Sequence, residues 1–233
     1  MRIFVLLGST LIGALLLMSG CANKDMQAKN SGFLSNYKGL EEHDKLEGTR
    51  IHIAPGADFT KYENIYIEDV QIVSAIPEDK WTPEQKILFE KMTTYLTQGY
   101  KNAISEGTGY RLVEDKNTPK TLVFEGAVSA VEVHFDDMEW YQFTPITLGM
   151  TMAARATYVD GAVRILGEGR FLDGKTDKVL MRMMRLQKGE EVTTDADRLV
   201  FKDVKPALDA WLSGTEENIV KLRKGVIKYQ KNQ

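Results

Sequence analysis

Apolar and polar positions divide the chain into a leading apolar run and a longer stretch with the periodicities of strands and helices. The leading run covers residues 3–18, with one charge before it at Arg2 and the small residues Ser19 and Gly20 after it. A helix that spans a bilayer needs about 20 apolar residues, so this run is too short. Its length and the small residues at its end are typical of a signal segment. We therefore expect residues 1–20 to be removed.

Two stretches have the period-2 pattern of strands, and each changes parity part-way along. In residues 63–73, Ile65 and Ile67 share one parity, whereas Val70 and Ile72 share the other. In residues 121–135, the same change separates apolar positions 122, 124 and 128 from 131, 133 and 135. Side chains alternate between the faces of a strand, so a continuous apolar face requires a bulge or sharp twist at each change. We expect the first near residues 68–69, and the two strands to be neighbours in a strongly curved sheet.

The strongest helix signal lies between these strands and starts at Thr82. Thr82 and Gln85 have the spacing of a capping box, and Pro83 stands at the first helical position, where proline is favoured. Apolar or small residues then recur at spacings of three and four, namely Leu88, Met92, Leu96, Gly99 and Ala103, flanked by Tyr95 and Ile104. Gly107 and Gly109 should end the helix. Because Gly99 and Ala103 are small, we expect this helix to lie close against a sheet.

The remaining pattern completes a single-domain α+β fold with a mostly antiparallel, curved sheet and helices packed on one side. It predicts a short strand over 110–114, a helix rather than a strand over 146–158, and a hairpin of strands 163–171 and 178–187. The first hairpin strand has Arg164, Glu168 and Arg170 on one face. Thr194 or Asp195 should cap a helix that Pro206 bends or restarts. Thr215 should cap a last amphipathic segment with apolar positions 219, 222, 226 and 229.

Composition excludes several kinds of function. The 233 residues are 43% apolar, which can supply a core for one large domain. The formal net charge is −3, and it becomes about −4 once Arg2 is removed, so nothing suggests a nucleic-acid partner. Cys21 is the only cysteine. If Cys21 is acylated, no thiol remains for a disulfide, a metal site or a nucleophile.

Residues 17–21, Leu-Met-Ser-Gly-Cys, resemble the lipobox of bacterial lipoproteins. This resemblance implies cleavage before Cys21 and lipid attachment to it, although Met18 stands where leucine is usual. Several acyl chains would make the attachment stable, because one chain alone binds only marginally. Ala22 after the cysteine implies the outer membrane in the Gram-negative class, with the protein facing the periplasm. We therefore interpret residues 21–31 as a lipidated tether and residues 32–233 as a single domain. The alternatives to a lipid anchor are export without lipid and an uncleaved membrane-spanning segment.

Two further motifs resemble the opening of the domain-of-unknown-function 3313 family of exported bacterial lipoproteins. Residues 31–37 match its Ser-Gly-Phe-Leu signature followed by tyrosine, and residues 55–62 match Pro-Gly-x-Asp-Phe-x-x-Tyr. Residues 172–180 resemble the family's Asp-x-x-Thr-Gly hairpin, with Asp177 in place of glycine, which leaves the turn type open. The resemblance covers most of residues 31–215 and implies no established activity.

Motifs for catalysis or metal binding are weak in this sequence, and we expect no cofactor and no metal. His43, His52 and His134 are too scattered for a metal site, and the mature chain has no Gly-x-Ser-x-Gly motif. The acidic pairs at 136–137 and 190–191 are interpreted as solvated loop residues rather than a general acid and base. Gly167-Glu168-Gly169 precedes a charged strand and not a helix. Its glycines are therefore interpreted as permitting a bulge or close packing, and not as a phosphate loop.

Two groups of side chains are candidates for binding. Trp140, Tyr141 and Phe143 fall in a predicted loop, and such aromatic residues are favoured at the centres of interfaces. The alternative is that they fold back over the open end of the sheet. Met181, Met183 and Met184, with Met150 and Met152, could bind a soft metal such as copper. Arg182 and Arg185 beside them would repel a cation, so core packing is the favoured interpretation.

The sequence thus favours a lipid-anchored, non-catalytic binding or assembly module whose partner is another envelope protein or polymer. The alternative is an envelope hydrolase that acts on cell-wall or lipid material. A deep pocket with converging Asp or Glu side chains would favour the hydrolase, and a shallow aromatic surface would favour the module. Methionines from positions 150 or 152 that converge on Met181 and Met183 would favour copper binding.

Overall fold

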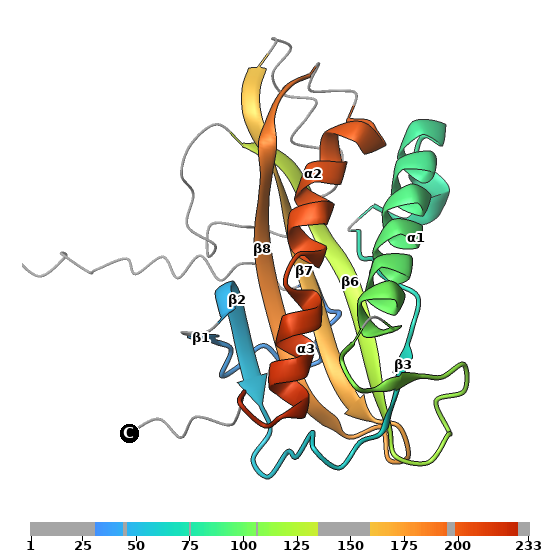
Figure 1. The fold of residues 1–233 in the computed structure, drawn as a ribbon. Helices are drawn as coiled ribbons and strands as arrows, with labels where there is room; N and C mark the ends of the chain where they lie inside the picture. Colours follow the sequence, from blue (N-terminus) through green and yellow to red (C-terminus); the bar gives the residue numbers. More distant parts are fainter. Residues whose placement is uncertain are drawn as a thin grey trace, which may run out of the picture.

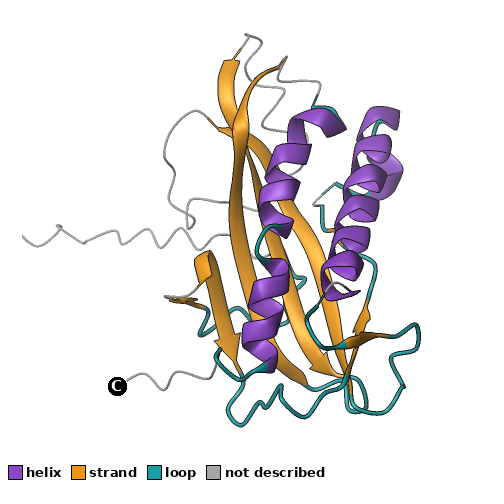
Figure 2. Ribbon diagram, viewed as in Figure 1, coloured by secondary structure: helices purple, strands orange, loops and turns teal. Residues whose placement is uncertain are grey.

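The computed structural model describes residues 31–43, 46–74, 76–105, 107–134, 159–194 and 199–227. In these ranges one sheet is covered on one face by helices (Figures 1 and 2). Its strands are β1 (Glu41–His43), β2 (Leu46–Ile53), β3 (Asn64–Ile67), β4 (Gln71–Ile72), β5 (Arg111–Leu112), β6 (Thr121–His134), β7 (Val159–Asp173) and β8 (Val179–Thr194). The α-helices are α1 (Pro83–Ser105), α2 (Phe201–Leu212) and α3 (Thr215–Arg223), and Glu78–Lys80 form the 3-10 turn η1.

The strand order along the sheet is β1-β2-β8-β7-β6-β3-β5, and β4 also pairs with β6. The pairs from β1 through β6 are antiparallel, whereas β3 and β4 run parallel to β6, and β5 runs parallel to β3. Parallel pairing requires a crossover connection, which α1 supplies between β4 and β5. The predicted α+β fold with a mostly antiparallel sheet is confirmed.

Both changes of parity correspond to irregularities in the sheet. β3 ends at Ile67 and β4 begins at Gln71, yet both pair with β6. In the gap, the Val70 N–H leaves the sheet and donates to Thr97 Oγ1 of α1 at 2.9 Å. In β6, the register against β7 shifts between Val128 and Ala130. The predicted irregularities and the predicted neighbours are therefore confirmed, since the apolar face stays continuous across each shift.

Helix α1 begins as predicted but packs differently at its small residues. The Thr82 N–H donates to Gln85 Oε1 at 2.9 Å, and the Gln85 N–H donates to Thr82 Oγ1 at 3.2 Å, which completes the capping box. A side chain at Gly99 would overlap Leu212 of α2. The expectation that Gly99 brings α1 close to the sheet is thus wrong, because the space it leaves is filled by the neighbouring helix.

Strands β1 and β2 were not predicted, because Gly48 and charged residues interrupt the apolar pattern there. Strands β7 and β8 of the hairpin extend beyond the predicted bounds at both outer ends. As a result, Glu190 and Glu191 lie in a strand and not in a loop. Residues 135–158, with the predicted helix and the acidic pair at 136–137, lie outside the described residues.

The C-terminal helices differ from the predictions at their starts. Thr194 is the last residue of β8, Asp195 lies outside the described residues, and Val200 precedes the first turn of α2. The Val200 N–H donates to Asp203 Oδ2 at 3.0 Å, so the side chain of Asp203 satisfies this end of the helix. Pro206 lies inside α2, which continues without restarting, because a proline so near the start removes only a bond to the first turn.

Helix α3 is shorter than the predicted amphipathic segment. Its N-cap is Gly214, at φ 74°, and Thr215 is the first helical residue rather than the cap. Ile219 and Leu222 are buried as expected, whereas Val226 lies beyond the helix and is 46% exposed. Position 229 lies outside the described residues. The apolar face of α3 is therefore confined to its nine helical residues.

Candidate functional site

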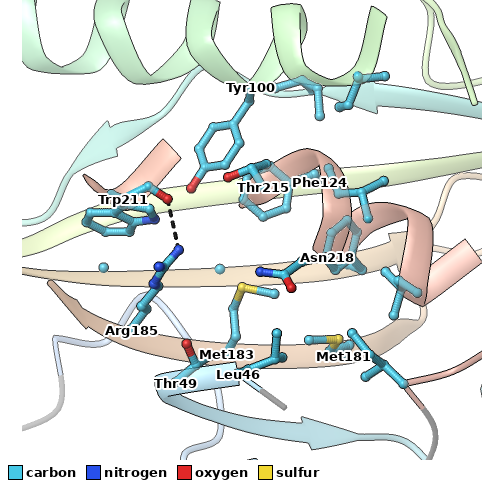
Figure 3. Close-up of a pocket in the computed structure, with 18 of the residues that line it drawn as sticks. Leu46, Thr49, Tyr100, Phe124, Met181, Met183, Arg185, Trp211, Thr215 and Asn218 are labelled. Atoms are coloured by element: carbon cyan, nitrogen blue, oxygen red, sulfur yellow. Dashed lines mark hydrogen bonds between the residues drawn. The ribbon is translucent and has the colours of Figure 1, made fainter. Parts of the chain in front are cut away.

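A cavity of about 90 Å³ lies between the sheet and the helices (Figure 3). Strands β2, β3, β6, β7 and β8 form its floor, and side chains from α1, α2 and α3 form its roof. Most of the lining is apolar, including Ile65, Phe124, Phe171, Met181, Met183 and Ile219. Apolar side chains that line an internal space favour an apolar ligand, because binding there removes the apolar surface of the ligand from water.

Glycines in β7 shape the floor of this cavity. A side chain at Gly167 would overlap the indole ring of Trp211, which occupies the space beside the strand at this point. A Cβ atom at Gly169 would lie 3.1 Å from Phe124 Cε2 and 3.2 Å from Met183 Cγ. The interpretation that the glycines of this segment permit close packing is confirmed. They let α2 approach the sheet while the side chains of Phe124 and Met183 close over β7.

One end of the cavity is polar. Arg185 Nη1 donates to the carbonyl oxygen of Trp211 at 2.8 Å, and the Tyr100 hydroxyl points toward Trp211 (Figure 3). Burial raises the pKa of Tyr100 to about 12, although Arg185 and Trp211 act in the opposite direction. Burial also lowers the pKa of Arg185, and Tyr100 opposes that change. An arginine stays charged even so, because its ordinary pKa exceeds 12.

Two uncharged polar side chains accompany Arg185. Thr49 lies opposite Arg185 in the pairing of β2 with β8 and is buried. Asn218 of α3 points into the cavity beside Met183 (Figure 3). The cavity thus has a cation and hydrogen-bonding groups at one end and hydrocarbon over the remainder. This arrangement can hold a molecule of matching polarity.

The alternation along β7 separates Glu168 from this cavity. Its backbone contributes to the lining, but its carboxylate lies on the opposite face of the sheet and accepts a hydrogen bond from the Tyr37 hydroxyl at 2.6 Å. No second carboxylate lines the cavity within the described residues, so no converging acidic pair favours a hydrolase there. The described ranges also contain no group of three or more His, Cys, Asp and Glu side chains suited to a metal ion.

The face of the sheet opposite the helices carries residues 31–40, which we call the strap. The Tyr37 hydroxyl accepts hydrogen bonds from the backbone N–H groups of Gly32 and Leu34, both at 3.1 Å, and donates to Glu168. The Arg182 guanidinium donates to the carbonyl oxygens of Asn36 and Lys38. The Ser-Gly-Phe-Leu motif and its tyrosine therefore form a closed turn that is attached to the sheet through buried charges.

The structure places the sequence-predicted site residues in different regions. Cys21, Trp140, Tyr141 and Phe143 lie outside the described residues, as do Met150 and Met152. Met181 and Met183 share the cavity face, as predicted, and Met184 packs on the other face beside Ala130 and Leu166. Of the histidines, His52 contacts the carbonyl oxygen of Gly39 through Nδ1 at 3.3 Å.

Sequence reasoning missed Tyr100, Trp211 and the role of Arg185 in this site. Arg185 was noted only as a charge that would repel a metal cation. One signal could have found it, because Arg185 has the same strand parity as Met181 and Met183 and so belongs to the core face. A charged residue on an apolar strand face is a candidate for a site.

These features define a single-domain α+β protein with a mainly apolar internal cavity that has one cationic end. The chain belongs to the family described as protein of unknown function (DUF3313), whose model matches residues 29–215. It is similar to the uncharacterized lipoprotein YdcL of Escherichia coli strain K12, at 28% identity over 201 residues, which is 84% of this chain and 87% of the relative. The recognition of a lipoprotein of this family is confirmed. In the described residues, no helix has the length and apolar character needed to cross a membrane.

Solved structures with partial likeness come from several bacteria. Hypothetical protein CT253 of Chlamydia trachomatis is 9% identical with a TM-score of 0.40, covering 70% of this chain and 96% of its own. Protein XCC0632 of Xanthomonas campestris is 10% identical with a TM-score of 0.39, covering 75% and 91%. The PelC dodecamer of Paraburkholderia phytofirmans is 13% identical with a TM-score of 0.33, covering 68% and 96%. At TM-scores this low, the likenesses support no statement about function.

Proposed function

We propose that this protein is a non-catalytic binding module of the bacterial envelope, anchored through Cys21, that holds an apolar chain of another envelope component in its cavity. The observation that carries the proposal is the cavity itself, lined by hydrocarbon under α1 and α3 and provided with one polar end. Ligand sites are typically concave and apolar, with a few polar groups that fix orientation. A binding role therefore suits this lining better than acid–base catalysis, which needs a positioned proton donor and acceptor.

Membership of the family and the similarity to a lipoprotein support the anchored part of the proposal. Acylation of Cys21 would hold the domain at the outer membrane on its periplasmic side, and Ala22 after the cysteine agrees with that membrane. Residues 21–31 could extend roughly 30 Å, so the domain would stay near the lipid surface. Apolar chains of lipids or of lipidated envelope components are abundant within that distance.

The anchor is tested by labelling cells with radioactive palmitate. The unchanged protein should incorporate label and sediment with the outer membrane, whereas the Cys21→Ser variant should do neither. Label on the variant, or unchanged sedimentation, would contradict the anchor. This test leaves the cavity intact, so it examines attachment separately from binding.

The cavity is tested in cells by replacing methionine with a photoreactive methionine that carries a diazirine. Irradiation should link a small apolar molecule to Met181 or Met183, which line the cavity. Met184 is the matched control, because it is the next residue in β8 and lies on the other face. Mass spectrometry of the peptide locates the adduct. An equal yield at Met184, or no adduct at the cavity positions, would contradict the proposed binding.

We further propose that Trp140, Tyr141 and Phe143 recognise the protein or polymer that presents the bound chain. Aromatic residues are enriched in the energetic centres of interfaces, which supports this assignment. Alanine at Trp140 and Tyr141 should remove specific cross-links in intact cells and leave the melting temperature unchanged. A lower melting temperature with unchanged cross-links would assign these side chains to the fold instead.

A further inference from the structure

The polar end of the cavity contains a cation whose hydrogen bonds are incomplete. Arg185 Nη1 bonds to the neutral carbonyl oxygen of Trp211, and Arg185 Nε is buried without a partner in the described part of the chain. Buried polar atoms nearly always have a partner, either in the protein or in a bound molecule. In the described ranges Arg185 bonds to a carbonyl oxygen and forms no ion pair with a carboxylate. An anion bound beside this guanidinium would therefore be stabilised.

The neighbours of Arg185 suit the same kind of ligand. The Tyr100 hydroxyl is protonated at neutral pH, as any tyrosine with an ordinary or raised pKa is, and it can therefore donate a hydrogen bond. Thr49 lies opposite Arg185, and Asn218 points into the cavity beside Met183 (Figure 3). The guanidinium binds carboxylate and phosphate groups through parallel N–H bonds, which fixes the orientation of the ligand as well as its charge.

We propose that the cavity binds an anionic amphiphile, with a carboxylate or phosphate head at Arg185 and Tyr100 and an alkyl chain against Met181, Met183 and Phe171. This inference rests on the proposed function and specifies the class of the bound chain. The head and the chain occupy opposite ends, because the cation and the hydrocarbon of the lining are separated along β8. A neutral amphiphile could give Arg185 only an uncharged acceptor, which makes a weaker bond than an anion, and a cationic one would be repelled.

The size of the cavity sets a limit on the buried chain. A volume of about 90 Å³ has room for about three groups of the size of a water molecule, at about 30 Å³ each. Each buried methylene should strengthen binding about fourfold. Affinity in the series butanoate, hexanoate, octanoate and decanoate should therefore rise at first and then level off, since later carbons stay outside the cavity.

The experiment uses the full chain in phosphatidylcholine nanodiscs, with ¹³C-methyl methionine as the reporter. Octanoate, 1-octanol and octylammonium are titrated, and the Met181 and Met183 methyl signals are followed. Octanoate should bind at least about tenfold more tightly than 1-octanol, and octylammonium most weakly. Equal binding of octanoate and 1-octanol would overturn the anionic class but leave the proposed cavity function intact. Unchanged methyl signals with all three probes would overturn both.

Substitutions separate the charge from the fold. Arg185→Met should weaken octanoate about tenfold or more and leave 1-octanol unchanged. Arg182→Met is the matched control, because Arg182 lies on the same strand but contacts the strap, and octanoate affinity should not change. Equal losses of octanoate affinity in the two variants would overturn the proposal. If Arg185→Met does not fold, the comparison of octanoate with 1-octanol on the wild-type protein still tests it. Octyl phosphate is titrated in parallel with octanoate. The anion that binds more tightly indicates whether the natural head group is a phosphate or a carboxylate.

Discussion

The two faces of strands β7 and β8 are built from alternate residues of the same short segments. On the helix face, Gly167 and Gly169 leave room for Trp211, and Met183 and Arg185 line the cavity. On the opposite face, Glu168 and Arg182 are buried beneath the strap and bonded to it. One face therefore encloses a space, whereas the other is filled and closed by hydrogen bonds to charged groups.

This difference shows how buried charge is treated on each face. Glu168 has the Tyr37 hydroxyl, and Arg170 pairs with Glu125 at 2.6 Å, so these two charges on the strap face have partners within the chain. Arg185 on the helix face has a carbonyl oxygen only, and its Nε has no partner in the described residues. Satisfied buried polar groups stabilise a fold, whereas a buried donor such as Arg185 Nε can accept a further hydrogen-bond partner. We infer that the strap face is structural and the helix face is functional.

The largest expected effect comes from Gly167→Ala on the helix face. The added Cβ would overlap the Trp211 ring, and Trp211 is buried in the core, so the ring has little room to move aside. We expect a loss of about 3 kcal/mol in the free energy of unfolding, measured by urea denaturation. Gly169→Ala is the matched control on the same strand face and should cost about 1 kcal/mol, because its neighbours are flexible side chains. Similar losses at both positions would argue against the close packing of Trp211.

Tyr37→Phe tests the strap face. The change removes the acceptor for two backbone N–H groups and the donor to the buried Glu168 carboxylate. We expect a loss of about 2 kcal/mol and faster hydrogen exchange in residues 31–40, with octanoate binding unchanged. In a double-mutant cycle with Glu168→Leu, the two losses should add only in part, since both substitutions remove the bond between Tyr37 and Glu168. Altered octanoate binding in Tyr37→Phe would show that the two faces are coupled.

A smaller effect is expected at Asp173, the last residue of β7. Burial alone would raise the pKa of Asp173, but hydrogen bonds from Tyr62 and from Thr176 and Lys175 outweigh it and lower the pKa to about 2. The unfolded value is about 3.9, so this carboxylate stabilises the fold above pH 4, and the contribution is lost as pH falls toward 2. The stability advantage of the wild type over Asp173→Asn should shrink across that range in denaturation at several pH values.

Removal of the Tyr62 hydroxyl is the control for this pH dependence. Tyr62 donates to Asp173 Oδ2 at 2.7 Å, so Tyr62→Phe should reduce the pH-dependent contribution without abolishing it. Hydrogen-exchange protection factors, which correct for the intrinsic effect of pH on exchange, should decrease equally on both faces as the pH falls. A loss of protection confined to the strap or to the residues around the cavity would show that the hairpin turn stabilises one face more than the other.

The smallest effect is expected at the tip of the same hairpin. Asp177 has φ 53°, a left-handed conformation that glycine adopts more easily, and glycine is the residue expected from the family pattern. Asp177→Gly should therefore stabilise the protein by about 0.5 kcal/mol, despite the loss of a long ion pair to Lys116. Asp177→Ala loses the ion pair and does not gain the conformational freedom of glycine, so it should destabilise the protein. The melting temperature measures both changes, and neither should alter one face of the sheet more than the other.

Sequence alone located several elements because their signals are local. The capping box at Thr82 and Gln85 depends on residues three apart, and the parity changes near positions 68 and 129 depend on neighbours within one strand. The hairpin was predicted, and the left-handed residue in its turn proved to be Asp177 itself. The family was recognised from motifs at residues 31–37 and 55–62, within the range that its model matches.

The tertiary structure decided which surfaces meet. β2 was missed because its strand conformation depends on pairing with β8 rather than on its own pattern. The periodicity of residues 83–105 shows that Gly99 is on an apolar face, but not that Leu212 fills the space beside it. Likewise, sequence parity places Arg185 on the core face, whereas its carbonyl partner and the cavity beside it come from the packing of α2 and α3. Local patterns record which side of an element avoids water, and only the packing of distant elements determines what that side contacts.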